Sequence, residues 1–158
     1  MFEMLVGLSI RDIVLIDSID LEFKKGFCVL TGETGAGKSI LLNALGLALG
    51  ERADVGLIRI GSDTATVSAE FIDIFSDSLS AILEEQGISC TDSLILRRIL
   101  RADGRSRAFI NDVLVSVNFL RKCGENLVEI HGQQDGRGLL MQSTHRSLLD
   151  SYGGLENL

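Results

Sequence analysis

The sequence contains no proline and no tryptophan, and it has only one tyrosine and three cysteines in 158 residues. Without proline or low-complexity stretches there is no sign of an interdomain linker, so we expect one domain over residues 1–158. The cysteines are Cys28, Cys90 and Cys123. Their odd number and the lack of a C-x-x-C spacing favour reduced thiols in a cytosolic protein over disulfides or metal ligands.

Long apolar runs and a surplus of basic residues are also absent. No apolar run approaches the length that spans a bilayer, and residues 1–8 lack the features of a secretory signal, so we expect no membrane contact. With 15 Lys and Arg against 22 Asp and Glu, the formal net charge is −7. A nucleic-acid site is therefore expected to be local, because the whole surface is too acidic for one.

The most informative stretch runs from residue 27 to residue 49. Residues 27–31 form a short apolar run bounded by glycines, which predicts a buried parallel strand. The spacing of apolar residues after Lys38 predicts a helix. Between them lies a match to the phosphate-loop pattern G-x-x-x-x-G-K-[ST], formed by Gly32, Glu33, Thr34, Gly35, Ala36, Gly37, Lys38 and Ser39. The alternative is a glycine-rich turn between strand and helix that binds no ligand.

The residue types of this loop suit a nucleotide. Glycines lack a Cβ atom, so the backbone can curl its N–H groups around a phosphate. Lys38 would place a positive charge on the β- and γ-phosphates, and Ser39 would offer its hydroxyl to Mg²⁺. The start of the helix favours an anion. We therefore expect ATP and Mg²⁺ at residues 32–40, a range that ends at Ile40.

Apolar spacing and turn residues predict the other elements. Alternation predicts strands, and glycines mark the ends of helices. The predicted strands cover residues 4–11, 14–23, 64–74 and 126–131, with a turn at Asp12-Ile13 between the first two. The predicted helices are one that begins at Ser76 or Asp77 and stops at Gly87, and one over residues 116–122 that Gly124 closes.

Five arginines lie within a hairpin predicted over residues 94–110. Asp103-Gly104 is a strong signal for a two-residue turn between its strands. The arginines are Arg97, Arg98, Arg101, Arg105 and Arg107. Such a cluster can hold a DNA backbone in a salt-dependent way. A solvated hairpin whose arginines pair with nearby carboxylates is the alternative.

A polar turn follows the predicted strand over residues 126–131. Ligand contacts in open α/β sheets lie after core strands, and Gln133 has an amide that can contact both Mg²⁺ and water. A glutamine in an ordinary turn is the alternative.

Several stretches together resemble one known family. They are LSIRDIVLIDSIDLEFKKGFCVLTGETGAGKSILLNALGLALGERA, DGRSRAFIND, and VEIHGQQD followed by LLMQSTHRSLLD. In this order they resemble the N-terminal head segment of the RecN family of bacterial DNA repair proteins, in the SMC-like branch of the ABC ATPases. The resemblance covers essentially the whole chain. It implies an α/β fold, the N-terminal half of an ABC-type P-loop ATPase head, with an antiparallel β element and a β-hairpin.

The resemblance also implies roles and partners. Gln133 matches the Q-loop position, so Lys38 and Gln133 are the expected catalytic residues, and Ser39 and Gln133 the expected Mg²⁺ ligands. The family's head is built from the two ends of a long chain separated by a coiled coil, and two ATP-engaged heads form a homodimer. Family members act on DNA double-strand breaks or ends, which implies a cytoplasmic, nucleoid-associated bacterial protein.

Some features depart from the family pattern. Asp12-Ile13 stands where relatives commonly have Asn-Phe, which puts a contact near the adenine in doubt. The sequence has no LSGG-type signature and no apolar run ending in Asp-Glu, the carboxylates that activate water. We therefore expect a fragment cut near the start of the coiled coil, which binds nucleotide weakly and does not turn it over. Two alternatives stay open: the head of another SMC-type chromosome protein, and a DNA-binding scaffold module whose nucleotide loop is silent.

Overall fold

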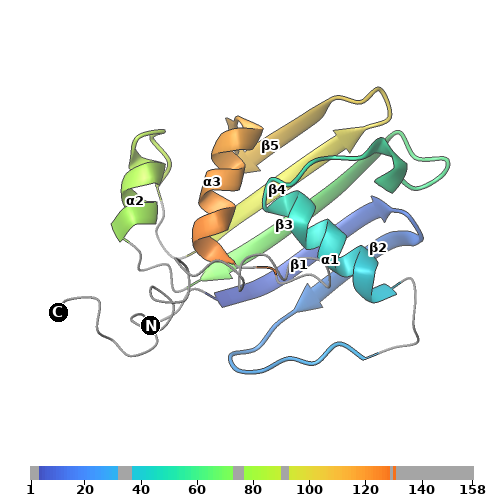
Figure 1. Cartoon of the computed structure of the whole chain (residues 1–158), viewed down its shortest axis with the longest axis horizontal. Coiled ribbons are helices and arrows are strands. Elements are labelled where there is room, and N and C mark those ends of the chain that lie inside the picture. The colour runs from blue at the N-terminus through green and yellow to red at the C-terminus, as the bar shows by residue number, and fades with distance from the viewer. Residues whose placement is uncertain (1–3, 32–36, 73–76, 90–92, 129, 131–158) are drawn as a thin grey trace, which may run out of the picture. The chain divides into compact units, whose positions relative to one another are not determined.

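A computed structural model describes residues 4–31, 37–72, 77–89, 93–128 and 130. The chain divides into two compact units, residues 1–128 and 129–158, and nearly all described residues belong to the first. Its elements (Figure 1) are β1 (Met4–Ile13), β2 (Ile16–Glu22), α1 (Gly37–Ala48), a 3-10 turn η1 (Val55–Leu57), β3 (Thr64–Ile72), α2 (Asp77–Glu84), β4 (Ser93–Arg101), β5 (Ser106–Ile110), β6 (Val113–Val115) and α3 (Val117–Leu127). No helix within the described ranges is long and apolar enough to cross a bilayer.

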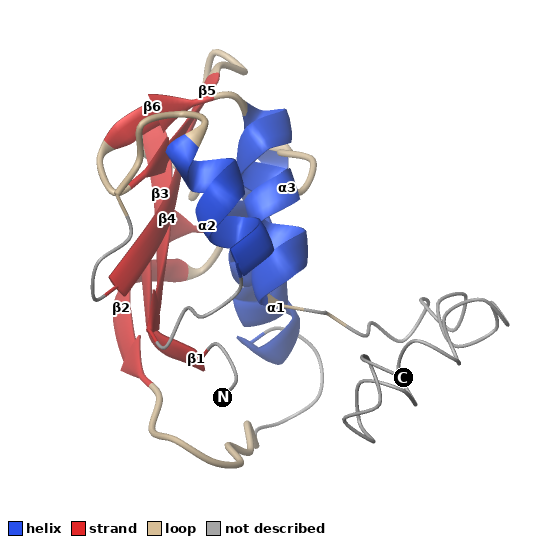
Figure 2. Ribbon diagram, turned by 90° about the vertical axis from the view of Figure 1, so that its left-hand side faces the viewer, coloured by secondary structure: helices blue, strands red, loops and turns tan. Residues whose placement is uncertain are grey.

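The six strands form one antiparallel sheet in the order β2-β1-β3-β4-β5-β6. The three helices lie on one face of this sheet, and the described residues leave the other face uncovered (Figure 2). The side chains of the core lie between the sheet and the helices. In β3, for example, Ala65, Val67, Ala69 and Phe71 are buried while the residues between them are not. This alternation confirms the period-2 pattern that predicted the strand.

The first two strands form the predicted antiparallel hairpin, but the turn lies later in the chain than expected. β1 continues through Asp12 and Ile13, and the turn falls at Val14 and Leu15. The loop after α1 supports the displaced turn, because the Val14 N–H donates to the Leu57 carbonyl at 2.8 Å and the Arg59 N–H donates to the Asp12 carbonyl at 2.9 Å. The predicted turn at Asp12-Ile13 was therefore wrong by two residues.

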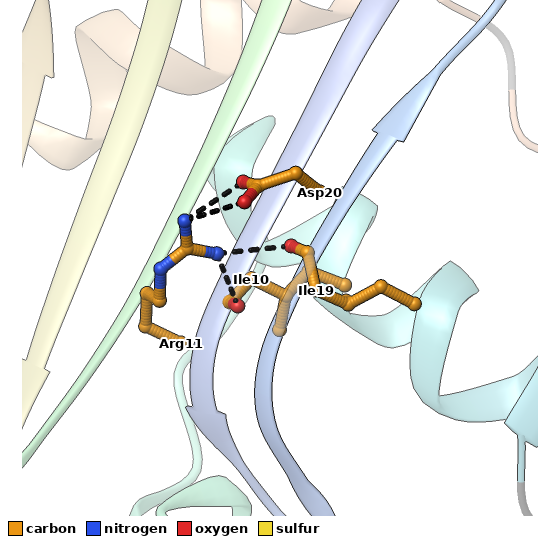
Figure 3. A network of polar contacts seen from close by, with 4 residues as sticks. All are labelled: Ile10, Arg11, Ile19 and Asp20. Carbon is orange, nitrogen blue, oxygen red and sulfur yellow. Dashed lines mark hydrogen bonds and ion pairs between the residues drawn. The ribbon is translucent and has the colours of Figure 1, made fainter.

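Arg11 joins β1 to β2 on the uncovered face (Figure 3). Its Nη2 donates to both carboxylate oxygens of Asp20 at 2.8 Å, and its Nη1 donates to the carbonyls of Ile10 and Ile19 at 2.9 and 3.0 Å. Hydrogen bonds from the Ser9 hydroxyl and then from Arg11 lower the pKa of Asp20. Both terminal nitrogens of the Arg11 guanidinium thus bond within the hairpin.

The second predicted hairpin is also present, with a different turn. The Gly104 N–H donates to the Arg101 carbonyl and Gly104 has a φ of +83°, so a three-residue loop replaces the predicted two-residue turn. A short strand, β6, then follows β5 and was not predicted. Its turn is formed by Asn111 and Asp112, both at positive φ (45° and 65°), which is the pattern of a type I′ turn.

Helix α3 begins as predicted and ends later. Ser116 caps it by accepting a hydrogen bond from the Phe119 N–H at 3.1 Å. Gly124 was predicted to close the helix, but α3 continues to Leu127, so the strand predicted over residues 126–131 was wrong at its start. Gly124 is needed for space and not for a stop, because a Cβ atom there would lie 2.6 Å from the Leu49 carbonyl oxygen.

Candidate nucleotide-phosphate site

The candidate site is centred on the first turn of α1, where Gly37, Lys38, Ser39 and Ile40 are described. Lys38 is half-buried and Ser39 is exposed. The first turn contains no acidic residue, so nothing within it opposes the favourable interaction between the start of a helix and an anion. The backbone N–H groups of a first turn have no partner within the helix. These features suit a bound phosphate.

Packing holds this turn in place. Ile40 and Ala44 are buried one turn apart, and Leu47 and Ala48 follow on the same side of α1. They pack α1 against the middle of the sheet, mainly on β3 and also on β1 and β4. At the other end, Gly50 takes a φ of +95°, the left-handed conformation typical of a glycine that follows a helix. The start of α1 is therefore positioned by the packing of the helix against the sheet.

The segment that leads into the loop differs from its prediction. Residues 27–31 do not form a strand and they are exposed, with Phe27 95% exposed, Val29 63% and Leu30 45%. A buried parallel strand needs a hydrogen-bonded neighbour, and the described sheet is wholly antiparallel and does not include this segment. The prediction of a buried strand was wrong for this chain, although the apolar pattern behind it is real.

Other predicted site residues lie outside the described residues. They are Gly32, Glu33, Thr34, Gly35 and Ala36 of the loop, and Gln133. Their roles stay predictions. In the described part of the chain, no group of His, Cys, Asp or Glu residues is arranged to hold a metal ion. The Ser39 hydroxyl, exposed at the start of α1, suits a cation that is shared with a phosphate.

The five predicted DNA-binding arginines do not form one surface. Arg97 donates to Asp112 at 2.7 Å, and its guanidinium lies 4.8 Å from the centre of the Phe109 ring. Arg101 and Arg105 lie at the hairpin turn, where each has a nitrogen 3.6 Å from the same Asp103 oxygen. Arg107 is exposed.

The fifth, Arg98, lies on the opposite face of the sheet. It is 3% exposed and is therefore separated from the other four arginines and from any surface-bound phosphate. Its Nη2 donates to the Ser106 hydroxyl at 2.9 Å, while Nε and Nη1 have no hydrogen-bond partner among the described residues. Burial lowers its pKa. Its place in the alternation of β4, between Leu96 and Leu100, is the sequence signal that points to the core.

Comparisons with known proteins agree with this picture. Residues 8–91 match the family described as an AAA domain. The DNA repair protein RecN of Vibrio cholerae is 42% identical over 155 residues, which cover 98% of this chain and 28% of that protein. The chain thus spans a little over a quarter of the length of that curated relative.

Solved structures share the fold. The Smc head domain of Pyrococcus furiosus, solved with an extended coiled coil and bound to the C-terminal domain of ScpA, has a TM-score of 0.70 and 20% identity, over 95% of this chain and 42% of that one. A chain from work on ATP-driven dimerization and DNA-stimulated activation of SMC ATPases has a TM-score of 0.63 and 21% identity, over 93% of this chain and 97% of that one. These likenesses confirm the predicted fold, the N-terminal part of a P-loop ATPase head.

Proposed function

This chain belongs to the AAA domain family, whose match covers more than half of it, and we propose that it is the ATP-binding N-terminal segment of a RecN-like head. The observation that carries the proposal is the start of α1. There Lys38 and Ser39 of the phosphate-loop pattern occupy the first turn of a helix fixed on the core, and that turn has no carboxylate.

The roles of the residues follow from their chemistry. Lys38 and the backbone N–H groups at residues 32–40 would bind the β- and γ-phosphates, and the Ser39 hydroxyl would help to hold Mg²⁺. Bound Mg²⁺ supplies positive charge that offsets the charge developing on the phosphates. Gln133 would orient a water molecule. The base that activates this water is not among these residues, so we propose that the chain alone binds ATP without hydrolysing it.

The exposed apolar segment supports a partner for this site. Phe27, Val29 and Leu30 are apolar and exposed, which is typical of a surface that a partner covers. They directly precede the phosphate loop. We propose that the C-terminal half of the same head supplies the neighbouring strand, buries this segment and completes the site. The parent protein would then form ATP-engaged head dimers and act on DNA double-strand breaks or ends in the bacterial cytoplasm, near the nucleoid.

The proposal can be tested by competition. The chain is incubated with a fluorescent ATP analogue and Mg²⁺, and unlabelled ATP or AMP is added. ATP should displace the analogue and AMP should not, because AMP lacks the β- and γ-phosphates that the first turn of α1 would bind. Equal displacement by the two would show that the site recognises only the nucleoside and α-phosphate, and would overturn the proposal.

A DNA-binding scaffold with a silent nucleotide loop is the alternative function. The structure leaves three of the predicted arginines at one end of the β4–β5 hairpin: Arg101, Arg105 and Arg107. Salt-dependent DNA binding that survives Lys38→Ala and fails when these three are neutralised would favour it.

A further inference from the structure

The uncovered face of the sheet has a charge pattern that the proposed nucleotide site does not explain. Alternate residues of each strand point to this face, and the strand register places them in rows. Because the three helices cover the other face (Figure 2), these side chains belong to no core in the described part of the chain. Along the strand direction, acidic side chains lie toward one end of this face and basic side chains toward the other.

One end of the face is acidic. Gly7 is in register with Glu22 on one side and with Glu70 on the other. Among the described residues, neither side-chain carboxylate has a hydrogen-bond or ion-pair partner. Glycine leaves space between them, and the surface here is hollowed by about 410 Å³, with both glutamates and Gly7 among the lining residues. Lys24 and Lys25 follow beyond the end of β2.

The opposite end is basic. Arg107 of β5 is in register with Ile99 of β4. Arg101 lies two residues after Ile99 and so on the same face of β4. Arg105 joins them at the turn, where Arg101 and Arg105 each have a nitrogen 3.6 Å from a carboxylate oxygen of Asp103. Arg107 is exposed, and its side chain makes no hydrogen bond or ion pair within the described ranges.

The centre of the face is electrically balanced. Arg11 is bonded to Asp20 at 2.8 Å, and Arg97 to Asp112 at 2.7 Å. On the strands and the β4–β5 turn, the charges that remain without an ion pair as close as these are two glutamates at one end and three arginines at the other, with Lys24 and Lys25 beyond the glutamates. A face of this kind is complementary to itself when one copy is turned over.

The spacing of the charges fits this arrangement. Glu22 and Glu70 are two strands apart, about 10 Å, and Arg101 and Arg107 are one strand and two residues apart, about 8 Å. We propose that this face docks on the same face of a second copy of the chain. The two copies are related by a two-fold axis that lies in the plane of the face. This symmetry places Glu70 over Arg107 of the second copy and Glu22 over its Arg101, and it repeats both contacts with the two copies exchanged.

The dimer is expected to be weak. Exposed ion pairs contribute little each, because water screens their charges. It is also independent of nucleotide, because α1 lies on the other side of the sheet (Figure 2). Association should therefore be measured by analytical ultracentrifugation at high protein concentration and low salt, without nucleotide.

Charge reversal gives a sharp test. Glu70→Arg and Arg107→Glu should each weaken self-association about tenfold or more, because each places like charges together at both symmetric contacts. An equimolar mixture of the two variants should associate again, since every contact in the mixed dimer joins opposite charges. The double variant, E70R with R107E, should also recover association. Glu125→Arg and Lys122→Glu, exposed changes on α3, serve as matched controls that should have no effect.

The outcomes decide the proposal. The proposal would be overturned if the unchanged chain did not self-associate, or if Glu70→Arg and Arg107→Glu both associated as the unchanged chain does. It would also be overturned if the mixture of these two variants stayed monomeric. Binding of DNA by the same arginines is distinguished by Glu70→Arg, which adds positive charge and should strengthen DNA binding while it weakens self-association. Circular dichroism of each variant confirms that the sheet is folded.

Discussion

Gly124 illustrates how a single residue can be identified correctly as important for the wrong reason. Its position predicted a helix stop, yet it lies inside α3 where the helix crosses the residues that follow α1. The sequence marks a glycine, but only the structure shows the Leu49 carbonyl that excludes a side chain. Arg98 is a similar case, because its charge suggested a surface role while its position in the alternation of β4 places it in the core.

Gly124→Ala is predicted to destabilise the chain. A Cβ atom would lie 2.6 Å from a backbone oxygen that cannot move alone, and overpacking of this kind costs about 1–3 kcal/mol. This exceeds the gain of about 1 kcal/mol that alanine brings to a helix interior. Urea unfolding should show a lower midpoint. Gly7→Ala is the control, because its Cβ would be 3.6 Å from the nearest atoms, and equal stability of the two variants would contradict the packing.

The cysteines are predicted to differ in reactivity. Cys123 is fully buried in α3, and burial raises its pKa to about 11, whereas Cys28 is exposed. A thiol reagent at pH 8 should label Cys28 quickly and Cys123 only after unfolding, as measured by mass spectrometry of digested peptides. Since the folded chain holds the Cys123 proton more tightly, its contribution to stability should be lost as the pH rises from 9 to 11. Fast labelling of Cys123 in the folded chain would contradict its burial.

At the scale of elements, the antiparallel sheet was largely predictable. The alternation in β3 and the turn residues of the hairpins depend on neighbours within the chain, so local patterns were sufficient, and only turn positions and the short β6 were missed. The apolar run at residues 27–31 predicts a strand equally well, but a strand also needs a neighbour. No described strand pairs with it, and the pattern cannot show this.

Phe27→Ser is predicted to leave the chain's own stability unchanged within about 0.5 kcal/mol, because the side chain is 95% exposed. The same change should weaken the association of the chain with the C-terminal half of the head, measured by co-purification of the two halves. Leu114→Ser, another exposed apolar position, is the control and should affect neither property. A large loss of stability in Phe27→Ser would show that the segment already packs within this chain.

For the molecule as a whole, the site could be predicted only in part. Lys38 and Ser39 lie in the first turn of a helix as the motif requires, and the AAA match includes them. The remaining loop residues and Gln133 fall outside the described residues, so their roles stay predictions. The chain spans 28% of the length of its relative from Vibrio cholerae, and we propose that the signature and the water-activating carboxylates lie in other segments of the parent protein. Turnover is therefore a property to be expected of the assembled head.

The most direct test is a calorimetric titration of the chain with ATP and Mg²⁺, beside Lys38→Ala. The account predicts binding heat for the unchanged chain, and a loss of affinity of roughly tenfold or more in the variant, since hydrogen bonds to a charged group contribute about 1.5–3 kcal/mol. Circular dichroism of the variant should match that of the unchanged chain. Equal affinity of the two, or no binding by either, would contradict the claim that the start of α1 forms a phosphate site by itself.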